Sequence, residues 1–386
     1  MNATTQGDLG LARKLSAIHA ELPVARYLPG EVYTSEKIAE LEKARIFMTH
    51  WLCVGRIEEL PEVGDYLTAR IMGEPIIVVR ETDANIVAFM NMCLHRGVEI
   101  AQGTGNTKRF QCPYHSWTYD CGGRLCSTPL MENAGDVLST DQLPQLRTAI
   151  WRGWIFINFD ENAATFEQYI EPFESELWYY RTEECRLATK IEFTVDANWK
   201  FIAENILDFY HLRTVHAGTF GKLYKVGNDP LPAKLLPNGG GSMVFASSLR
   251  NSDPNLPFPR LPWLKESAFS GKGMIFPNIN FWCGADSLRM WHMWPISPSQ
   301  THAVCYVMLP EDSFAVPEFE AKLDKYREYV RSVIEEDRVA LESLQNAAGS
   351  GRFEPGPLSH LELMLHHLMS HYASIIASPT GQASKP

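Results

Sequence analysis

Two short segments of this 386-residue chain each carry one cysteine and one histidine, and the geometry that these side chains need constrains the fold more than any other feature. The first segment reads Cys-x-His and the second Cys-x-x-His, with sixteen residues (96–111) between them. Thiolates and imidazoles at such spacing are typical metal ligands, so two loops must meet around one metal centre. The four residues are Cys93, His95, Cys112 and His115.

The pairing of these ligands indicates which metal they hold. A structural zinc site also takes two cysteines and two histidines, but it usually draws its cysteines from one tight turn and its histidines from a helix. Here each segment supplies one thiolate and one imidazole, which suits a Rieske [2Fe-2S] cluster, where two thiolates bind one iron and two imidazoles bind the other. The alternating apolar run at 86–92 and the turn at Pro113 predict the order strand, loop, strand, loop.

A second group of metal-binding side chains ends at His216. The apolar spacing before it predicts a helix, on which Glu204, Asp208 and His211 share one face at i, i+4 and i+7. His216 lies five residues beyond His211, so both imidazoles reach one metal only if the helix distorts or ends between them. We expect such an ending, because Gly218 soon follows.

Two histidines and one carboxylate form the facial triad of non-haem iron(II) oxygenases, which leaves open positions on the metal. The best candidate for the carboxylate is Asp337, in a helical pattern that starts near Pro317 and stops near Gly349, with Leu341 and Leu344 on the same face. Periodicity alone favours an ordinary charge on the helix surface for this aspartate.

Together these segments resemble the large (alpha) subunits of the aromatic-ring-hydroxylating, Rieske non-haem iron oxygenases. The resemblance rests on Cys93-Leu-His-Arg-Gly with Cys112-Pro-Tyr-His-Ser-Trp-Thr-Tyr-Asp, on Asn198-Trp-Lys…Glu-Asn…Asp…Tyr-His-x₄-His, and on Glu336-Asp-Arg-Val-Ala-Leu-Glu-Ser-Leu-Gln. It implies that the four residues of the first set bind the [2Fe-2S] cluster and that His211, His216 and Asp337 bind a mononuclear Fe(II). It also implies that Asp208 bridges the iron site to a Rieske histidine of a neighbouring subunit.

The resemblance implies an α+β fold with two parts. Residues 46–159, rich in short strand patterns broken by Gly, Pro and Asp, are expected to form the β-rich Rieske domain. Residues 160–386 are expected to form a helix-grip-like catalytic domain with an antiparallel sheet and long helices. Residues 1–45 are expected to form N-terminal helices that pack on the catalytic domain.

Several local elements are predicted from patterns. A helical run is expected at Ser35–Phe47, and strands are expected at 187–195 and 302–309. Residues 226–273 are rich in Gly, Pro, Asn and Ser and are predicted to form loops, either a lid over the iron or a surface excursion.

Amino-acid composition limits the kinds of binding partner and the cellular compartment that we expect for this protein. A net charge of −11 argues against nucleic acid, because phosphate backbones demand clustered Lys and Arg. Eight cysteines are too few and too scattered for a secreted disulfide framework. No apolar run reaches membrane-spanning length, and the first residues lack the pattern of a signal peptide. We expect a cytoplasmic protein with no membrane partner.

The resemblance implies a terminal oxygenase that takes electrons from a ferredoxin and/or flavin reductase, and thus indirectly from NAD(P)H. It would use O2 to hydroxylate or oxidatively N- or O-dealkylate a small aromatic substrate, as a homotrimer. The chain is shorter than typical large subunits of ring dioxygenases, which favours a monooxygenase. Three alternatives stay open: a quaternary-amine (carnitine- or betaine-like) monooxygenase, an electron-transfer Rieske protein without oxygenase activity, and a zinc hydrolase with Glu204 as base.

Overall fold

The computed structural model describes residues 10–132, 140–221, 231–245, 257–265 and 269–378. The contacts within the chain divide it into two compact units. One unit is Phe47–Phe166, and the other combines Met1–Ile46 with Glu167–Pro386. Each unit has its own sheet, and each is described by itself below.

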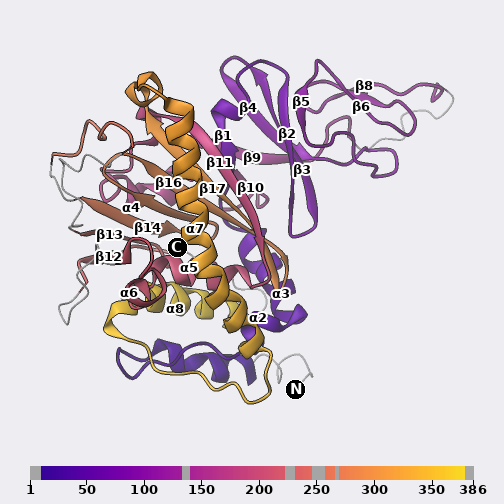
Figure 1. Ribbon diagram of the computed structural model, residues 1–386. Helices are drawn as coiled ribbons and strands as arrows, with labels where there is room; N and C mark the ends of the chain where they lie inside the picture. The colour runs from indigo at the N-terminus through magenta and orange to yellow at the C-terminus, as the bar shows by residue number, and fades with distance from the viewer. Residues whose placement is uncertain (1–9, 133–139, 222–230, 246–256, 266–268, 379–386) are drawn as a thin grey trace. The chain divides into compact units, whose positions relative to one another are not determined.

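The unit Phe47–Phe166 is built on antiparallel strands (Figure 1). Its larger sheet has the order β1-β10-β9-β4-β3-β2-β5, and a smaller sheet has the order β6-β7-β8. The strands of the larger sheet are β1 (Leu52–Arg56), β2 (Asp65–Ile71), β3 (Glu74–Thr82), β4 (Asn85–Met90), β5 (Thr104–Asn106), β9 (Gln145–Trp151) and β10 (Trp154–Asn158). Those of the smaller sheet are β6 (Phe110–Gln111), β7 (Thr118–Tyr119) and β8 (Leu125–Ser127).

The core of this unit reaches into the two loops that carry the cysteines and histidines. Ile77, Val79 and Phe89 point inward from alternate positions of β3 and from β4, as period-2 patterning requires. Cys93 and Cys112 are buried in the same cluster. The two loops are therefore anchored by apolar packing beneath them.

The other unit contains a seven-stranded sheet in the order β11-β17-β16-β15-β14-β13-β12, in which every pairing is antiparallel. Its strands are β11 (Cys185–Val195), β12 (Ala233–Leu235), β13 (Gly241–Phe245), β14 (Ser270–Ile275), β15 (Ile279–Cys283), β16 (Leu288–Ser297) and β17 (Gln300–Pro310). Its main helices are α2 (Glu31–Thr34), α3 (Glu36–Glu42), α5 (Trp199–Leu207), α6 (Leu212–Val215), α7 (Phe319–Ala348) and α8 (Leu363–Ala377). The strands predicted at 187–195 and 302–309 are present as β11 and β17.

The long helix α7 packs across this sheet (Figure 1). Leu323, Tyr326 and Val330 recur at helical spacing and are buried against Ile191 of β11 and Val307 of β17. The helix begins and ends close to the predicted limits, and the predicted α+β class with a long helix over an antiparallel sheet is confirmed. Of the two leucines expected on the face of Asp337, Leu341 is buried and Leu344 is 40% exposed.

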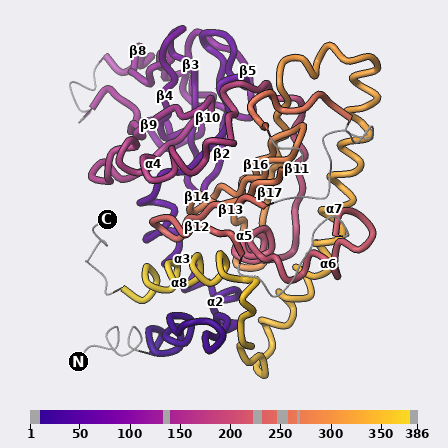
Figure 2. The backbone as a smooth tube through the Cα atoms, turned by 90° about the vertical axis from the view of Figure 1, so that its left-hand side faces the viewer, coloured from indigo at the N-terminus to yellow at the C-terminus, as the bar shows by residue number. Residues whose placement is uncertain are grey.

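The N-terminal helices pack on α7 and α8 within the same unit, as Figures 1 and 2 both show. The helical run predicted at Ser35–Phe47 is present as α3, which continues into a π-helical turn, Lys43–Phe47. Glu42 pairs with the fully buried Lys200 of α5 and accepts hydrogen bonds from Trp199 Nε1 at 3.0 Å and Tyr372 Oη at 2.6 Å. This buried network ties the N-terminal segment to α5 and α8.

The prediction of loops throughout residues 226–273 is wrong where β12, β13 and most of β14 form, whereas residues 257–265 lie outside any helix or strand, as predicted. One of its glycines, Gly273, allows two strands to pack closely. A Cβ on Gly273 would lie 2.2 Å from the carbonyl oxygen of Gly241, so the strand pair β13–β14 needs glycine there. Residues 226–230, 246–256 and 266–268 of the stretch lie outside the described residues.

Two candidate metal centres

The two Cys/His loops repeat one backbone pattern. In the first, Cys93 N–H donates to Val98 O at 2.9 Å, and Gly97 N–H donates back to Cys93 O at 2.8 Å. In the second, the N–H of Cys112 donates to Trp117 O at 2.8 Å, and the N–H of Ser116 donates to Cys112 O at 3.0 Å. The fifth residue of each loop has a positive φ, 76° at Gly97 and 60° at Ser116. Each loop is thus a tight, closed turn that presents its side chains toward the other loop.

The four side chains of these loops meet as like pairs. The Nδ1 atoms of His95 and His115 lie 3.1 Å apart, and both rings are exposed. Cys93 and Cys112 are buried in one apolar cluster, and burial, with a smaller contribution from the Cys112 thiol, raises the pKa of Cys93. Tyr119 Oη lies 3.2 Å from Cys93 Sγ and accepts the N–H of Leu94 at 2.9 Å, so it fixes the first loop beside its cysteine.

This arrangement fits a two-iron cluster better than one zinc ion. In a tetrahedral zinc site all four ligand atoms would surround one metal ion and would therefore lie close to one another. Within the described ranges, the one group of three or more potential ligands whose atoms all lie within 4.8 Å of one another is elsewhere, in the other unit. A buried thiolate pair and an exposed imidazole pair match the division of ligands between the two irons of a Rieske cluster.

The segment that carries the second set is broken earlier than predicted. Helix α5 ends at Leu207 and Asp208 is its C-cap, so Asp208 and His211 are not on one helical face with Glu204, and that expectation is wrong. His211 begins and His216 ends a single helical turn, α6. The short turn swings both imidazoles to one side, which a continuous helix could not do for residues five apart.

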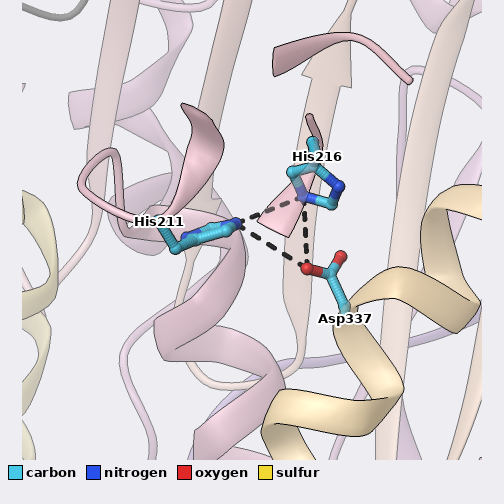
Figure 3. Close-up of side chains that lie close together, drawn as sticks. All are labelled: His211, His216 and Asp337. Atoms are coloured by element: carbon cyan, nitrogen blue, oxygen red, sulfur yellow. Dashed lines mark hydrogen bonds and ion pairs between the residues drawn. The ribbon is translucent and has the colours of Figure 1, made fainter. Parts of the chain in front are cut away.

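The structure brings His211, His216 and Asp337 together (Figure 3). His211 Nε2 lies 3.3 Å from His216 Nε2 and 3.7 Å from Asp337 Oδ1, and His216 Nε2 lies 3.2 Å from the same oxygen. Asp337 comes from the middle of α7, which supports it rigidly. Two imidazole nitrogens and one carboxylate oxygen on one side of a point are the donor set of a facial triad.

Each imidazole of this group is oriented by a carboxylate through its other nitrogen. Asp208 Oδ2 lies 3.0 Å from Nδ1 of His211, and Glu336 Oε2 lies 2.8 Å from Nδ1 of His216. Thr219 Oγ1 donates to the same Glu336 oxygen at 2.7 Å. Such contacts fix the tautomer and orientation of a ligating histidine. Glu336 was not predicted from the sequence, although it directly precedes Asp337.

These contacts also act on the protonation of the site. Burial by itself lowers the pKa of His216, but the hydrogen bonds and charges of Asp337 and Glu336 outweigh it and raise that pKa above its ordinary value. Burial lowers the pKa of Lys272 to about 7, against the opposing charges of Asp208 and Asp337.

Glu204 does not join the site. Its carboxyl group is buried and accepts a hydrogen bond from Tyr33 Oη at 2.9 Å. Burial raises the pKa of Glu204 well above its ordinary value, with further increases from Glu362 and Asp208. A zinc hydrolase that uses this residue as its base is therefore not supported.

A cavity of about 530 Å³ opens beside the triad. Asn205 and Asp337 both line this cavity, and Asn205 Nδ2 donates a hydrogen bond to Asp337 Oδ1 at 3.2 Å. Much of the remaining wall is apolar or aromatic and includes Phe209, Phe220, Phe245, Trp282, Trp291, Tyr326 and Tyr329. Phe245 and Pro257 come from the stretch 226–273, which therefore lies against this site in its described part.

Comparisons with known proteins agree with these two sites. Residues 50–147 match the family described as Rieske [2Fe-2S] domain, and residues 178–378 match the family described as ring hydroxylating alpha subunit (catalytic domain). The carnitine monooxygenase oxygenase subunit of Acinetobacter pittii (strain PHEA-2) is 36% identical over 202 residues, which are 50% of this chain and 54% of that one. The match thus spans about half the length of that relative.

Two further relatives cover more of the chain. The benzene 1,2-dioxygenase subunit alpha of Pseudomonas putida (strain ATCC 700007 / DSM 6899 / JCM 31910 / BCRC 17059 / LMG 24140 / F1) is 29% identical over 353 residues, which are 81% of this chain and 78% of that one. The solved structure of a quaternary ammonium Rieske monooxygenase superposes with a TM-score of 0.79 at 24% identity, covering 94% of this chain and 98% of that one. At that identity the superposition supports the fold alone. Of the helices in the described part of the chain, none is both long and apolar enough to cross a membrane.

Proposed function

The chain belongs to the ring-hydroxylating alpha-subunit family of Rieske non-haem iron oxygenases, and on that premise we propose that it is a monooxygenase acting on a small aromatic compound. Members of this family are oxidoreductases that carry a Rieske [2Fe-2S] cluster and a mononuclear iron, and they use O2 with electrons that a reductase takes from NAD(P)H. The proposed reaction is hydroxylation or oxidative N- or O-dealkylation.

One observation carries the proposal: His211, His216 and Asp337 converge on the wall of a largely apolar cavity. When bound, the two iron centres supply electron transfer and dioxygen activation. The three side chains would hold the mononuclear iron on one side and leave its other side toward the cavity. A pure electron carrier has no use for such a triad, which makes that alternative weaker.

The residues around the triad have distinct proposed roles. Asp208 and Glu336 hold the two imidazoles in the orientation that leaves Nε2 toward the metal. The aromatic wall excludes water and holds an apolar substrate beside the metal by contact rather than by coordination. Cys93, His95, Cys112 and His115 are assigned to the cluster.

The partners and assembly are also part of the proposal. A ferredoxin and/or flavin reductase would donate electrons to the cluster, and Asp208 would bridge the iron site to a Rieske histidine of a neighbouring subunit in a homotrimer, which provides a path for the electrons. Residues 46–159 are assigned to the Rieske domain, residues 160–386 to the catalytic domain and residues 1–45 to its N-terminal helices. A cytoplasmic location stays a prediction.

A quaternary-amine monooxygenase is the second candidate, because a carnitine monooxygenase oxygenase subunit is among the relatives. Product analysis separates the candidates, using the purified enzyme with a reductase, O2, and either an alkoxybenzene or carnitine. Metal analysis should find about three iron atoms per chain, and the reduced protein should show a Rieske signal by EPR. A protein with iron for the cluster alone, or without an EPR signal, would refute the oxygenase assignment.

A further inference from the structure

The wall of the cavity beside the triad carries more positive than negative side chains. Its cationic residues are Lys272, Arg289, Lys322 and Lys325, and its carboxylates are Asp286 and Asp337. Asp337 is assigned to the metal, whose charge it would offset. Burial raises the pKa of Asp286 to about 6 against the lowering effect of the charge of Arg289, so this carboxyl group is mostly ionised at pH 7 and offsets one of the four cations. Burial lowers the pKa of Lys272 to about 7, so this lysine is only partly protonated at that pH. A substrate that enters the cavity therefore meets an excess of positive charge on its wall.

Arg289 is held in place by two aromatic rings. It lies on β16 and is 7% exposed, and its guanidinium carbon is 3.8 Å from the ring centroid of Trp282 and 5.4 Å from that of Trp291. Stacking on an indole ring holds the guanidinium plane in place while its N–H edges remain in that plane. An arginine stays charged throughout the physiological pH range, and its paired N–H groups match the two oxygens of a carboxylate.

The other cations add positive charge to the same wall from two further elements, α7 and β14. Lys322 is half-buried and Lys325 is exposed, both on α7, and within the described part of the chain neither has an ion-pair partner at salt-bridge distance. Lys272 lies deeper on β14, where its Nζ donates to Ile206 O at 2.8 Å and to Asp208 O at 3.3 Å. A run of like charges along a low-dielectric cleft attracts ligands of the opposite sign.

The same geometry disfavours a ligand with a quaternary ammonium group. Such a group needs open aromatic faces. In this cavity Trp282 and Trp291 each have a face toward Arg289, Lys272 lies 4.2 Å from the centroid of Phe209, and Phe220 stacks on His216 at 4.3 Å. A quaternary ammonium group bound to these rings would place its positive charge beside those of Arg289 and Lys272.

We propose that the substrate of this cavity is a carboxylate with an apolar, aromatic body, and that Arg289 binds the carboxylate while the body extends toward the triad. This inference rests on the proposed function and deepens it, because it names the charge that the substrate carries. Lys322 and Lys325, which are less buried than Arg289, attract the anion to the cavity before it reaches Arg289.

Calorimetric titration of the iron-loaded enzyme with three probes tests the inference: phenylacetate, the neutral phenylacetamide and the cationic phenyltrimethylammonium. Phenylacetate should bind at least about tenfold more tightly than either of the others, because charge-assisted bonds are stronger than neutral ones. Arg289→Gln should abolish that preference. Arg331→Gln, which removes an exposed arginine of α7 outside the cavity wall, should leave it unchanged.

The ratio of the affinities of the wild-type enzyme for phenylacetate and phenylacetamide decides the inference even if the Arg289 variant does not fold. Lys322→Gln is a second variant, and it should weaken phenylacetate binding more than phenylacetamide binding. Equal affinities for acid and amide, or tightest binding of phenyltrimethylammonium, would overturn the inference. The EPR signal and iron content of the same samples keep the two claims apart. A protein with cluster and mononuclear iron but without the preference leaves the oxygenase assignment standing, whereas loss of the metal signals removes both.

Discussion

Replacing Glu336 by glutamine should weaken iron binding at the triad without unfolding the protein. Glu336 holds His216 by one carboxylate oxygen, at 2.8 Å from Nδ1, and His216 is 2% exposed, so water cannot take over that contact. Glutamine keeps the shape and loses the charge. Loss of such an orienting carboxylate typically costs about 10–100-fold in metal affinity, equivalent to about 1.4–2.8 kcal/mol. The strength of a hydrogen bond to a charged group, about 1.5–3 kcal/mol, leads to the same range.

The assay is an anaerobic competition between the protein and a ferrous chelator, followed by iron analysis, with the EPR signal as a check that the cluster is intact. Glu335→Gln is the matched control, because Glu335 is the neighbouring residue, has a side chain that is 60% exposed and forms an ion pair with Arg338 on the same helix. Exposed pairs of this kind contribute little, so the control should retain wild-type iron affinity. Equal iron affinity in the two variants would refute the role assigned to Glu336.

Three further predictions follow from the packing and the charges. Asp208→Ala should retain both metal centres but lose coupled turnover, since it removes the contact at 3.0 Å to His211 Nδ1; normal product formation with the reductase would contradict this. Glu42→Gln should lower the free energy of unfolding by about 3–5 kcal/mol in urea titrations, because it leaves the buried charge of Lys200 without its carboxylate; a loss below about 1 kcal/mol would contradict that. Burial, with a smaller effect of Lys190, lowers the pKa of His292 to about 3 in the folded protein, compared with about 6.5 in the unfolded chain. The contribution of His292 to stability is therefore complete above about pH 6.5 and is lost as the pH falls from there toward about 3. His292→Phe should therefore lose about 3 kcal/mol less stability than wild type between pH 7 and pH 4.5, and identical pH profiles would show the premise to be wrong.

Elements with long periodic patterns were predictable from the sequence. Helix α7 follows the predicted limits because its apolar residues repeat over thirty residues and a glycine follows them. The break after Leu207 was not predictable in the same way. The run from Trp199 to His211 has helical spacing throughout, and only tertiary contacts, such as the donation of Lys272 Nζ to the carbonyl oxygen of Ile206, stabilise an end there.

The triad and its supporting residue Asp208 were suggested by residue type and by resemblance, but the second supporting residue, Glu336, was not. Glu336 and Asp337 are adjacent on a helix and point in directions about 100° apart, so helical periodicity does not place both beside His216. Both reach His216 because its ring has a nitrogen toward each of them, Nδ1 toward Glu336 and Nε2 toward Asp337, and this tertiary contact cannot be read from the sequence. Arg289 was equally hidden, since on β16 it reads as one basic residue between apolar ones.

The single helical turn that carries His211 and His216 has another consequence. It is a short element between a helix end and residues outside the described range, while Asp337 belongs to a thirty-residue helix about 120 positions further along the chain. A metal held by both segments acts as a removable cross-link that closes a long loop of chain, and its binding energy adds to the stability of the folded state. Iron supply would then set the lifetime of the protein as well as its activity, because the turn is the part whose order depends most on the metal. Amide exchange across residues 208–221 should slow when iron binds and quicken when a chelator removes it.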